Sequence, residues 1–346
     1  MIPCAKEFFQ ASSPTSSYKF SITVLNQVFD SQGTGSIEYS YRILVLDSRI
    51  SIAILLIRNT ADARRRYLMA ERKWLITGIS SGFGKEIAAQ ALAAGDIVFG
   101  TARNMKKLDG LKAEYPETLL TAALDVTDTE SVYRVTEEAF RKLGTVDVVV
   151  SNAGYGLYGA AEEISDEEAL LQIQTNLIGS IAFIRSTLPY LRSQKHGRII
   201  QVASVAGQVG YAGNSLYNAT KFGITGYCEA LSIEMKPFNV GVTIVEPGGA
   251  RTDFRYGGVK VAKNLIPEYE HAHGFLTMID ASKGLAPGDP AAMASRIIES
   301  VDQEPAPKHI ALGSQALRQI LEDLSGRLAG YCSQIELAAS TDVKEL

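Results

Sequence analysis

Short apolar runs alternate with longer amphipathic segments along the chain from about residue 73 onward. The apolar runs predict strands at residues 74–76, 97–101, 119–126, 146–154, 198–204, 240–248 and 309–313. The amphipathic segments predict helices around residues 87–92, 105–114, 128–143, 165–191, 217–235, 289–301 and from 314 onward. Because strands and helices alternate, we expect a doubly wound parallel sheet with helices on both faces, a three-layer α/β/α fold.

This alternation is missing from residues 1–68. Their longest apolar run, Ile50 to Ile57, has eight residues and lies between two arginines. A membrane-spanning helix needs about twenty apolar residues, so no membrane span is predicted. We expect residues 1–68 to be an N-terminal extension that is disordered or not part of the core, and residues 69–346 to form a single domain.

A glycine-rich turn connects the first predicted strand of this domain to a helix. Its spacing, Gly-x-x-x-Gly-x-Gly, is a variant of the commoner dinucleotide-binding pattern Gly-x-Gly-x-x-Gly. Glycines let the backbone approach a pyrophosphate, and the helix start offers free N–H groups to its negative charge. The expected cofactor contacts are Gly78, Ser80, Ser81, Gly82, Phe83 and Gly84.

The end of the next strand indicates which dinucleotide is bound. NAD sites usually place an acidic residue here, but residues 100–105 contain none, and Arg103 follows Thr101 instead. A guanidinium suits a 2′-phosphate, and Lys106 and Lys107 are weaker candidates for the same contact. The sequence therefore predicts NADP(H) rather than NAD(H).

Tyr217 and Lys221 are the candidate proton-transfer residues. They are four positions apart on a predicted helix and so share one face, and a nearby cation lowers the pKa of a phenol from its usual value near 10. Ser204 lies thirteen residues before Tyr217, at the end of an apolar run. Tyr256 and Lys260 have the same spacing, but two glycines between them argue against a helix.

Seven short motifs in this order resemble the signature of the short-chain dehydrogenase/reductase family. They are TGISSGFG (77–84), LDVT (124–127), SNAG (151–154), TNLIG (175–179), Ser204, YNATK (217–221) and PGGARTDF (247–254). The resemblance covers about residues 72–256, with Ser151 where the family usually has asparagine. It implies a Rossmann-like domain and an NADP(H)-dependent oxidoreductase that interconverts a ketone or aldehyde and an alcohol by hydride transfer.

The resemblance also assigns roles to individual residues. Asn176 corresponds to the asparagine that holds a water in the proton relay, and Ser204 to the serine that bonds the substrate carbonyl. Tyr217 would transfer the proton, while Lys221 would lower the pKa of the tyrosine and bind the nicotinamide ribose. The remaining expected cofactor contacts are Asp125 and Val126 at the adenine, Asn152, Ala153 and Gly154 beneath the cofactor, Thr252 at the nicotinamide end, and Pro247 and Gly248.

Residues 254–288 lack regular periodicity, and family members usually fold a variable substrate lid here. Its mixed apolar composition favours an uncharged, hydrophobic or cyclic substrate. His271 and His273 have no accompanying ligand set, so we expect no metal.

Composition limits the kinds of binding partner and the cellular compartment that we expect. The 346 residues have a net charge of −4 and a pI near 5.7, which argues against nucleic acid as a partner. Cys4, Cys228 and Cys332 have no paired spacing, which favours a reducing compartment. We expect a cytoplasmic protein, with organelle targeting by the extension left open, and the resemblance implies a homodimer or homotetramer.

Two other functions compete with the reductase. A dinucleotide-sensing regulator without turnover would be expected to lose the Tyr-Lys pair, which is intact at Tyr217 and Lys221. A nucleotide-sugar epimerase or dehydratase would carry Gly-x-x-Gly-x-x-Gly and a larger C-terminal substrate domain.

Overall fold

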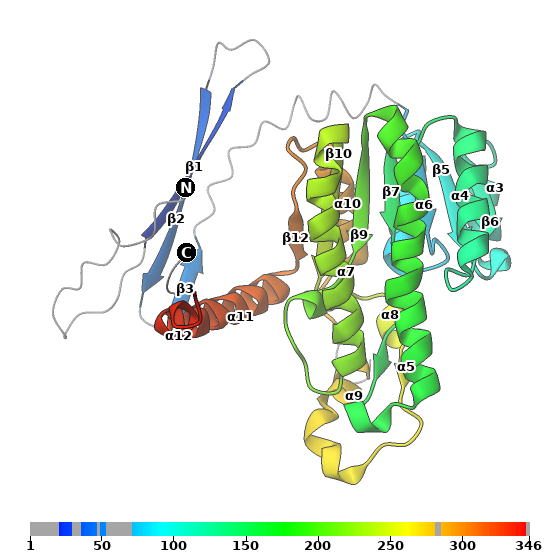
Figure 1. Ribbon diagram of the computed structural model, residues 1–346. Coiled ribbons are helices and arrows are strands. Elements are labelled where there is room, and N and C mark those ends of the chain that lie inside the picture. Colours follow the sequence, from blue (N-terminus) through cyan, green and yellow to red (C-terminus); the bar gives the residue numbers. More distant parts are fainter. Residues whose placement is uncertain (1–20, 30–35, 47–48, 53–70, 281–284, 344–346) are drawn as a thin grey trace. The chain divides into compact units, whose positions relative to one another are not determined.

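The computed structural model describes residues 21–29, 36–46, 49–52, 71–280 and 285–343 (Figure 1). These residues belong to two compact units, Met1–Tyr67 and Leu68–Leu346. In the first unit, β1 (Ser21–Phe29), β2 (Ser36–Leu46) and β3 (Arg49–Ile52) form an antiparallel sheet that the sequence pattern does not predict. The rest of the proposed extension lies outside the described residues, and its dispensability stays a prediction.

The second unit is built on a seven-stranded sheet whose paired strands all run parallel. In spatial order the strands are β12 (His309–Leu312), β10 (Val240–Pro247), β9 (Gly197–Val202), β7 (Val148–Ser151), β4 (Lys73–Thr77), β5 (Ile97–Ala102) and β6 (Leu119–Ala123). Strand order reverses between β4 and β7, which opens a crevice at their carboxyl ends. The predicted doubly wound fold is confirmed.

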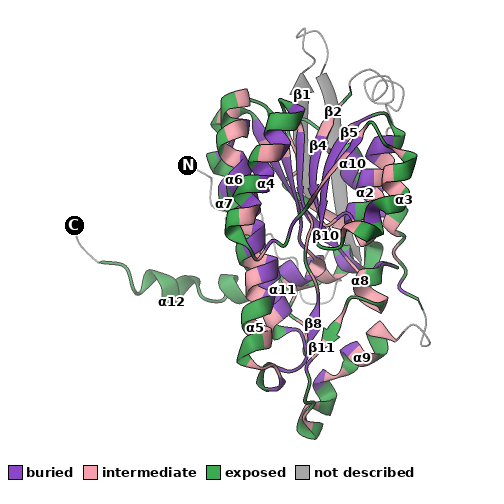
Figure 2. Ribbon diagram, turned by 90° about the vertical axis from the view of Figure 1, so that its right-hand side faces the viewer, coloured by how far each residue is buried: buried purple, intermediate pink, exposed green. Residues whose placement is uncertain are grey.

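Helices cover both faces of this sheet (Figures 1 and 2). One face carries α4 (Thr129–Leu143), α6 (Gly179–Gln194) and α7 (Ser215–Glu234); the other carries α2 (Gly82–Ala93) and α10 (Pro290–Ser300). The central strands are buried on both sides, which explains why their sequences are continuously apolar rather than alternating.

The helix predicted over residues 165–191 is interrupted. It begins as α5 (Asp166–Ile173), where the Ser165 hydroxyl accepts from the Glu168 amide and the Glu168 carboxylate accepts from the Ser165 amide. A π-helical turn, η3 (Gln174–Ile178), then leads into α6. Hydrophobic periodicity does not distinguish such a turn from the α-helix around it, so the turn was not predicted.

The remaining elements connect or follow these strands and helices. They include η1 (Met105–Leu108), α3 (Asp109–Glu114), β8 (Leu157–Tyr158), η2 (Ala161–Glu163), η4 (Val205–Gly207), η5 (Lys236–Phe238), α8 (Asp253–Tyr256), β11 (Lys260–Val261), η6 (Pro267–Ala272), α9 (Gly274–Ile279), α11 (Ser314–Cys332) and α12 (Ile335–Ala339). Tyr256 ends α8 and Lys260 begins β11, so this second Tyr-Lys pair does not share a helix, as predicted. Among the described residues, no helix is long and apolar enough to span a membrane.

Candidate active site

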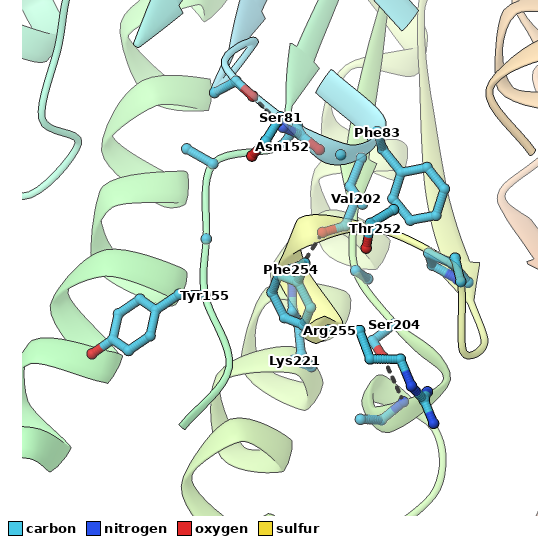
Figure 3. Close-up of a pocket in the computed structure, with 18 of the residues that line it drawn as sticks. Ser81, Phe83, Asn152, Tyr155, Val202, Ser204, Lys221, Thr252, Phe254 and Arg255 are labelled. Carbon is cyan, nitrogen blue, oxygen red and sulfur yellow. Dashed lines mark hydrogen bonds between the residues drawn. The ribbon is translucent and has the colours of Figure 1, made fainter. Parts of the chain in front are cut away.

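A cavity of about 600 Å³ lies at the carboxyl edge of the sheet (Figure 3). Loops that follow β4, β5, β6, β7, β9, β10 and β12 supply its walls, together with α7 and the segment after Thr252. Every residue predicted for catalysis or cofactor binding lines this cavity except Gly84, Asn176 and the weaker candidate Lys106. The sequence motifs, which are spread over about half the chain, thus form one site.

The turn after β4 has the backbone conformation that its glycines predict. Gly78 and Gly82 have φ angles of +73° and +57°, in the left-handed region that disfavours other residues. Gly84 has a different role from the predicted cofactor contact. A Cβ there would lie 2.4 Å from both the Gly78 carbonyl oxygen and the Asn152 amide nitrogen. Gly84 therefore allows α2 to begin tightly against the turn and does not line the cavity.

The start of α2 is open to an anion. Ser81 occupies the N-cap without capping the helix through its side chain, and the first turn carries no acidic residue. The amide of Asn152 donates to the carbonyl oxygens of Thr77 and Gly78 at 3.0 and 3.2 Å, which fixes the turn beside the helix start. Free N–H groups at a helix N-terminus beside close-packed glycines fit the pyrophosphate of a dinucleotide.

Positive charge dominates the cavity wall. Among the described lining residues the cationic side chains are Arg103, Lys107, Lys221 and Arg255, and the one carboxylate is that of Asp125. That carboxylate is turned into its own loop, where it accepts from the amide and hydroxyl of Thr127 at 3.0 and 2.8 Å. Arg103 and Lys107 are exposed near the end of β5, where an anionic group on the adenosine ribose would be accessible to them.

Lys221 lies on α7, almost fully buried, one turn after Tyr217. Its ammonium nitrogen donates to the carbonyl oxygen of Val202 at 3.0 Å (Figure 3). It also lies 5.6 Å from the centre of the Tyr217 ring. Burial lowers the pKa of Lys221 to about 8. A lysine in this state changes charge close to neutral pH.

The pKa of Tyr217 departs from the sequence-based expectation. We expected Lys221 to lower it; instead burial raises the pKa of Tyr217 well above 10, and the neighbouring Tyr158 raises it further. The Ser204 hydroxyl acts in the opposite direction but does not offset burial. Spacing on a helix places a cation near the phenol, but the surrounding apolar packing, which the spacing does not reveal, has the larger effect.

Ser204 lies just beyond β9, at the cavity wall (Figure 3). Its hydroxyl oxygen accepts from the Ala206 amide at 3.1 Å, at the start of a short 3-10 turn, η4. The same hydroxyl forms a hydrogen bond with Tyr217 that lowers the pKa of the phenol, so the two groups lie within reach of one substrate oxygen. This placement fits the predicted role of polarising a carbonyl.

Asn176 does not line the cavity, and its role in the proton relay stays a prediction. It lies in the π-helical turn η3, 1% exposed, and its side chain holds the backbone of Tyr155. The Asn176 amide oxygen accepts from the Tyr155 N–H at 3.0 Å, and its amide nitrogen donates to the Tyr155 carbonyl at 2.8 Å. Its side chain thus secures the loop after β7.

Several lining residues were not predicted. Tyr158 and Phe254 place their rings 6.2 and 6.1 Å from that of Tyr217 and enclose the reacting end of the cavity. Asn214 lies three residues before Tyr217 on the same face, and its buried Oδ1 has no partner within the described protein. Asn214 could have been predicted from its three-residue spacing to Tyr217. Phe254 could have been predicted because it ends the PGGARTDF motif.

Comparison with known families agrees with this geometry. The family model described as short chain dehydrogenase matches residues 72–258, which contain the glycine turn, Ser204, Tyr217 and Lys221. The chain belongs to the short-chain dehydrogenase family. Short-chain dehydrogenases are oxidoreductases that act on carbonyl and alcohol substrates with a dinucleotide cofactor, and the site described above fits such a cofactor.

Individual members of the family are similar over most of their length. Oxidoreductase BOA17 of Botryotinia fuckeliana (strain B05.10) is 34% identical over 245 residues, which are 70% of this chain and 89% of the relative. The crystal structure of a short-chain dehydrogenase from Streptomyces avermitilis is 36% identical, with a TM-score of 0.74 over 79% of this chain and 99% of that one. The structure of an alcohol dehydrogenase from Thermococcus sibiricus, complexed with 5-hydroxy-NADP, is 25% identical. Its TM-score is 0.59, and the match covers 70% of this chain and 96% of that one.

Proposed function

We propose that this short-chain dehydrogenase is an NADP(H)-dependent reductase of a hydrophobic or cyclic ketone or aldehyde, with Tyr217 as general acid. The observation that carries the proposal is the convergence of Ser204, Tyr217 and Lys221 with the start of α2 on one cavity. A regulator without turnover would have no use for this proton-transfer set. A nucleotide-sugar epimerase remains the weaker alternative, since the glycine spacing differs from the pattern expected for it.

The preference for NADP(H) is supported by charge. Arg103 and Lys107 both line the cavity, and no acidic residue occurs between Gly100 and Met105 to bond a ribose 2′-hydroxyl. A guanidinium and an ammonium together favour a 2′-phosphate. The Thermococcus sibiricus relative was crystallised with an NADP derivative, which agrees with this choice.

The chain's own residues perform the proton chemistry. The bound nicotinamide would supply or accept the hydride. Ser204 would donate a hydrogen bond to the carbonyl oxygen as negative charge develops there. Tyr217 keeps its proton at neutral pH because burial raises its pKa, so it begins the reaction as an acid and donates to the same oxygen. The Lys221 ammonium, on the same helix face, would stabilise the phenolate that results.

The substrate class follows from the reacting end of the cavity. Tyr158, Phe254 and Met278 supply apolar surface, and the described lining has no carboxylate free to bind a cationic group. We infer an uncharged, largely apolar carbonyl compound.

A cofactor and substrate screen tests the proposal. Binding of NADPH and NADH is measured by fluorescence titration, and NADPH oxidation is followed with cyclic and aromatic ketones against small 2-oxo acids. We expect tighter NADPH binding and turnover confined to the apolar ketones. Preference for NADH would contradict the cofactor assignment. Tight NADPH binding without turnover of any ketone would favour the regulator.

We also infer a homodimer or homotetramer. Large apolar side chains are exposed on and beside α5 and α7; they are Leu170, Leu171, Ile178, Phe222 and Ile233. Such a concentration of exposed apolar residues is typical of an interface. Analytical ultracentrifugation of the full chain would test this, and a monomer at micromolar concentration would contradict it.

A further inference from the structure

Glu163 connects the body of the domain to the proposed substrate lid. We define the lid segment as the described residues 254–280 and 285–288. The Glu163 side chain ends the 3-10 turn η2, before α5, and has no solvent exposure. One carboxylate oxygen accepts from the Ala160 amide at 2.6 Å. The other accepts from the Ile266 amide at 2.6 Å and from Nε2 of His273 at 2.7 Å.

These bonds account for how a carboxylate can be buried here. Burial by itself raises the pKa of Glu163, but the Ile266 and Ala160 amides and the His273 ring together bring it below its usual value. Glu163 is therefore ionised and can only accept hydrogen bonds. Nε2 of His273 must then carry a hydrogen. Two of the three donors belong to the lid segment, so the charge loses most of its hydrogen bonds if that segment moves.

A continuous set of ring contacts leads from this ion to the catalytic tyrosine. The His273 ring meets the Phe275 ring edge-on at 5.9 Å, and Phe275 stacks on Tyr158 at 5.4 Å. Tyr158 lines the cavity and lies 6.2 Å from Tyr217. A shift of the lid segment would therefore move Tyr158, the part of the cavity wall that faces Tyr217.

The lid segment packs closely against Gly213, which lies just before α7. A Cβ at Gly213 would lie 2.5 Å from the Ala272 carbonyl oxygen and 2.5 Å from the Phe275 ring. The Gly213 carbonyl accepts from the Gly159 amide at 2.9 Å, next to Tyr158. The lid segment, the loop of Tyr158 and the start of α7 therefore meet at one residue without room for a side chain.

We propose that Glu163 is a positioning residue whose buried carboxylate latches the lid segment and thereby fixes Tyr158 opposite Tyr217. It sets the shape of the substrate end of the cavity without touching the reacting atoms. The effect on substrate binding rests on the proposed reductase function. The contact between Glu163 and the lid segment is independent of that function.

The chain provides matched controls on neighbouring residues. Glu162 accepts one exposed hydrogen bond from the Tyr269 hydroxyl at 2.8 Å, and His271 is exposed. Glu163→Gln keeps the shape but replaces one acceptor oxygen by a donor, and Glu162→Gln makes the same change at the surface. His273→Leu removes the ring donor, whereas His273→Gln retains an N–H that can reach the carboxylate. His271→Leu controls for loss of a surface histidine.

Hydrogen exchange of the full-length variants, read by mass spectrometry, tests the latch without any substrate. We expect Glu163→Gln and His273→Leu to accelerate exchange in residues 266–279 and at 157–160 by at least tenfold. Glu162→Gln, His271→Leu and His273→Gln should stay within about twofold of wild type. Exchange in Glu163→Gln or His273→Leu that matches wild type would overturn the proposal. His273→Leu decides the question if Glu163→Gln does not fold.

Kinetics separate positioning from general destabilisation. With a ketone that the wild type reduces, we expect His273→Leu to raise the KM for the ketone at least fivefold while the Kd for NADPH stays unchanged. An unchanged ketone KM despite faster exchange would refute the positioning role. Absence of ketone reduction by the wild type would instead count against the proposed function, and the exchange result would still decide the latch.

Discussion

The ammonium nitrogen of Lys221 donates a hydrogen bond to the carbonyl oxygen of Val202, the last residue of β9, at 3.0 Å. This bond ties the middle of α7 to the strand end that precedes Ser204. Tyr217, one helical turn earlier, is held over the same strand end. The bond between Lys221 and Val202 therefore helps to position both candidate donors to a substrate oxygen, Ser204 and Tyr217.

The burial of Lys221 predicts a specific pH dependence of stability. Burial lowers its pKa to about 8 from 10.5, so between these values the unfolded chain binds more protons at this residue than the folded protein. The contribution of Lys221 to the free energy of unfolding should then rise with pH, by about 2 kcal/mol between about pH 8 and 9.5. Urea unfolding of wild type and Lys221→Met at both pH values checks this. Parallel pH profiles for the two proteins would contradict it.

Tyr217→Phe should abolish most of the turnover and leave cofactor binding intact. Loss of the proton donor is expected to lower kcat by about 10²- to 10⁴-fold, because no other described lining residue combines a phenol with the Lys221 neighbour. The Kd for NADPH should change less than threefold. Tyr256→Phe, at the second Tyr-x-x-x-Lys spacing, should keep kcat within a few-fold of wild type. Equal losses in both variants would show that Tyr217 has no special role.

Arg103→Ala should change the choice between cofactors. A charged hydrogen bond to phosphate contributes about 1.5–3 kcal/mol, so the KM for NADPH should rise about 10- to 100-fold. The KM for NADH should move by less than threefold, since it has no 2′-phosphate. Lys107→Ala should show the same direction with a smaller effect. Similar increases for both dinucleotides would indicate that Arg103 supports the fold and does not recognise the phosphate.

Replacement by alanine should have opposite effects on stability at two helical glycines, Gly84 and Gly226. A Cβ at Gly84 would meet the Gly78 carbonyl oxygen at 2.4 Å, whereas at Gly226, in the exposed part of α7, nothing lies within 4 Å. Gly84→Ala should therefore lower the melting temperature and weaken dinucleotide binding. Gly226→Ala should stabilise the monomer fold by about 0.5–1 kcal/mol. Thermal unfolding with and without NADPH distinguishes these effects, and a stable, tightly binding Gly84→Ala would contradict the close packing described for the turn.

Local patterns predicted the parts of the site that depend on neighbours in sequence. The glycine turn between β4 and α2 and the shared helix face of Tyr217 and Lys221 were both predicted from residue type and spacing. The end of each strand was less well defined, because residues such as Leu124 continue an apolar run after the ladder stops and enter the cavity wall.

Features that depend on distant residues were not predictable in this way. The pKa of Tyr217 is set by burial among groups from several elements, and the position of Asn176 depends on a turn that periodicity does not detect. The bond between Glu163 and His273 joins residues 110 positions apart, in a segment without periodicity. Nothing in either local sequence marks the other as a partner.

The π-helical turn between α5 and α6 has a consequence for insertions and deletions. It accommodates one residue more than an α-helix would over the same rise. Deleting a single residue from 174–178 would therefore restore a regular helix and leave α5 and α6 in their present phase. The change would be confined to the turn itself, where the amide of Asn176 now holds the backbone of Tyr155. The surplus residue thus serves the loop that borders the cofactor cavity, while the outer faces of α5 and α6 would stay as they are.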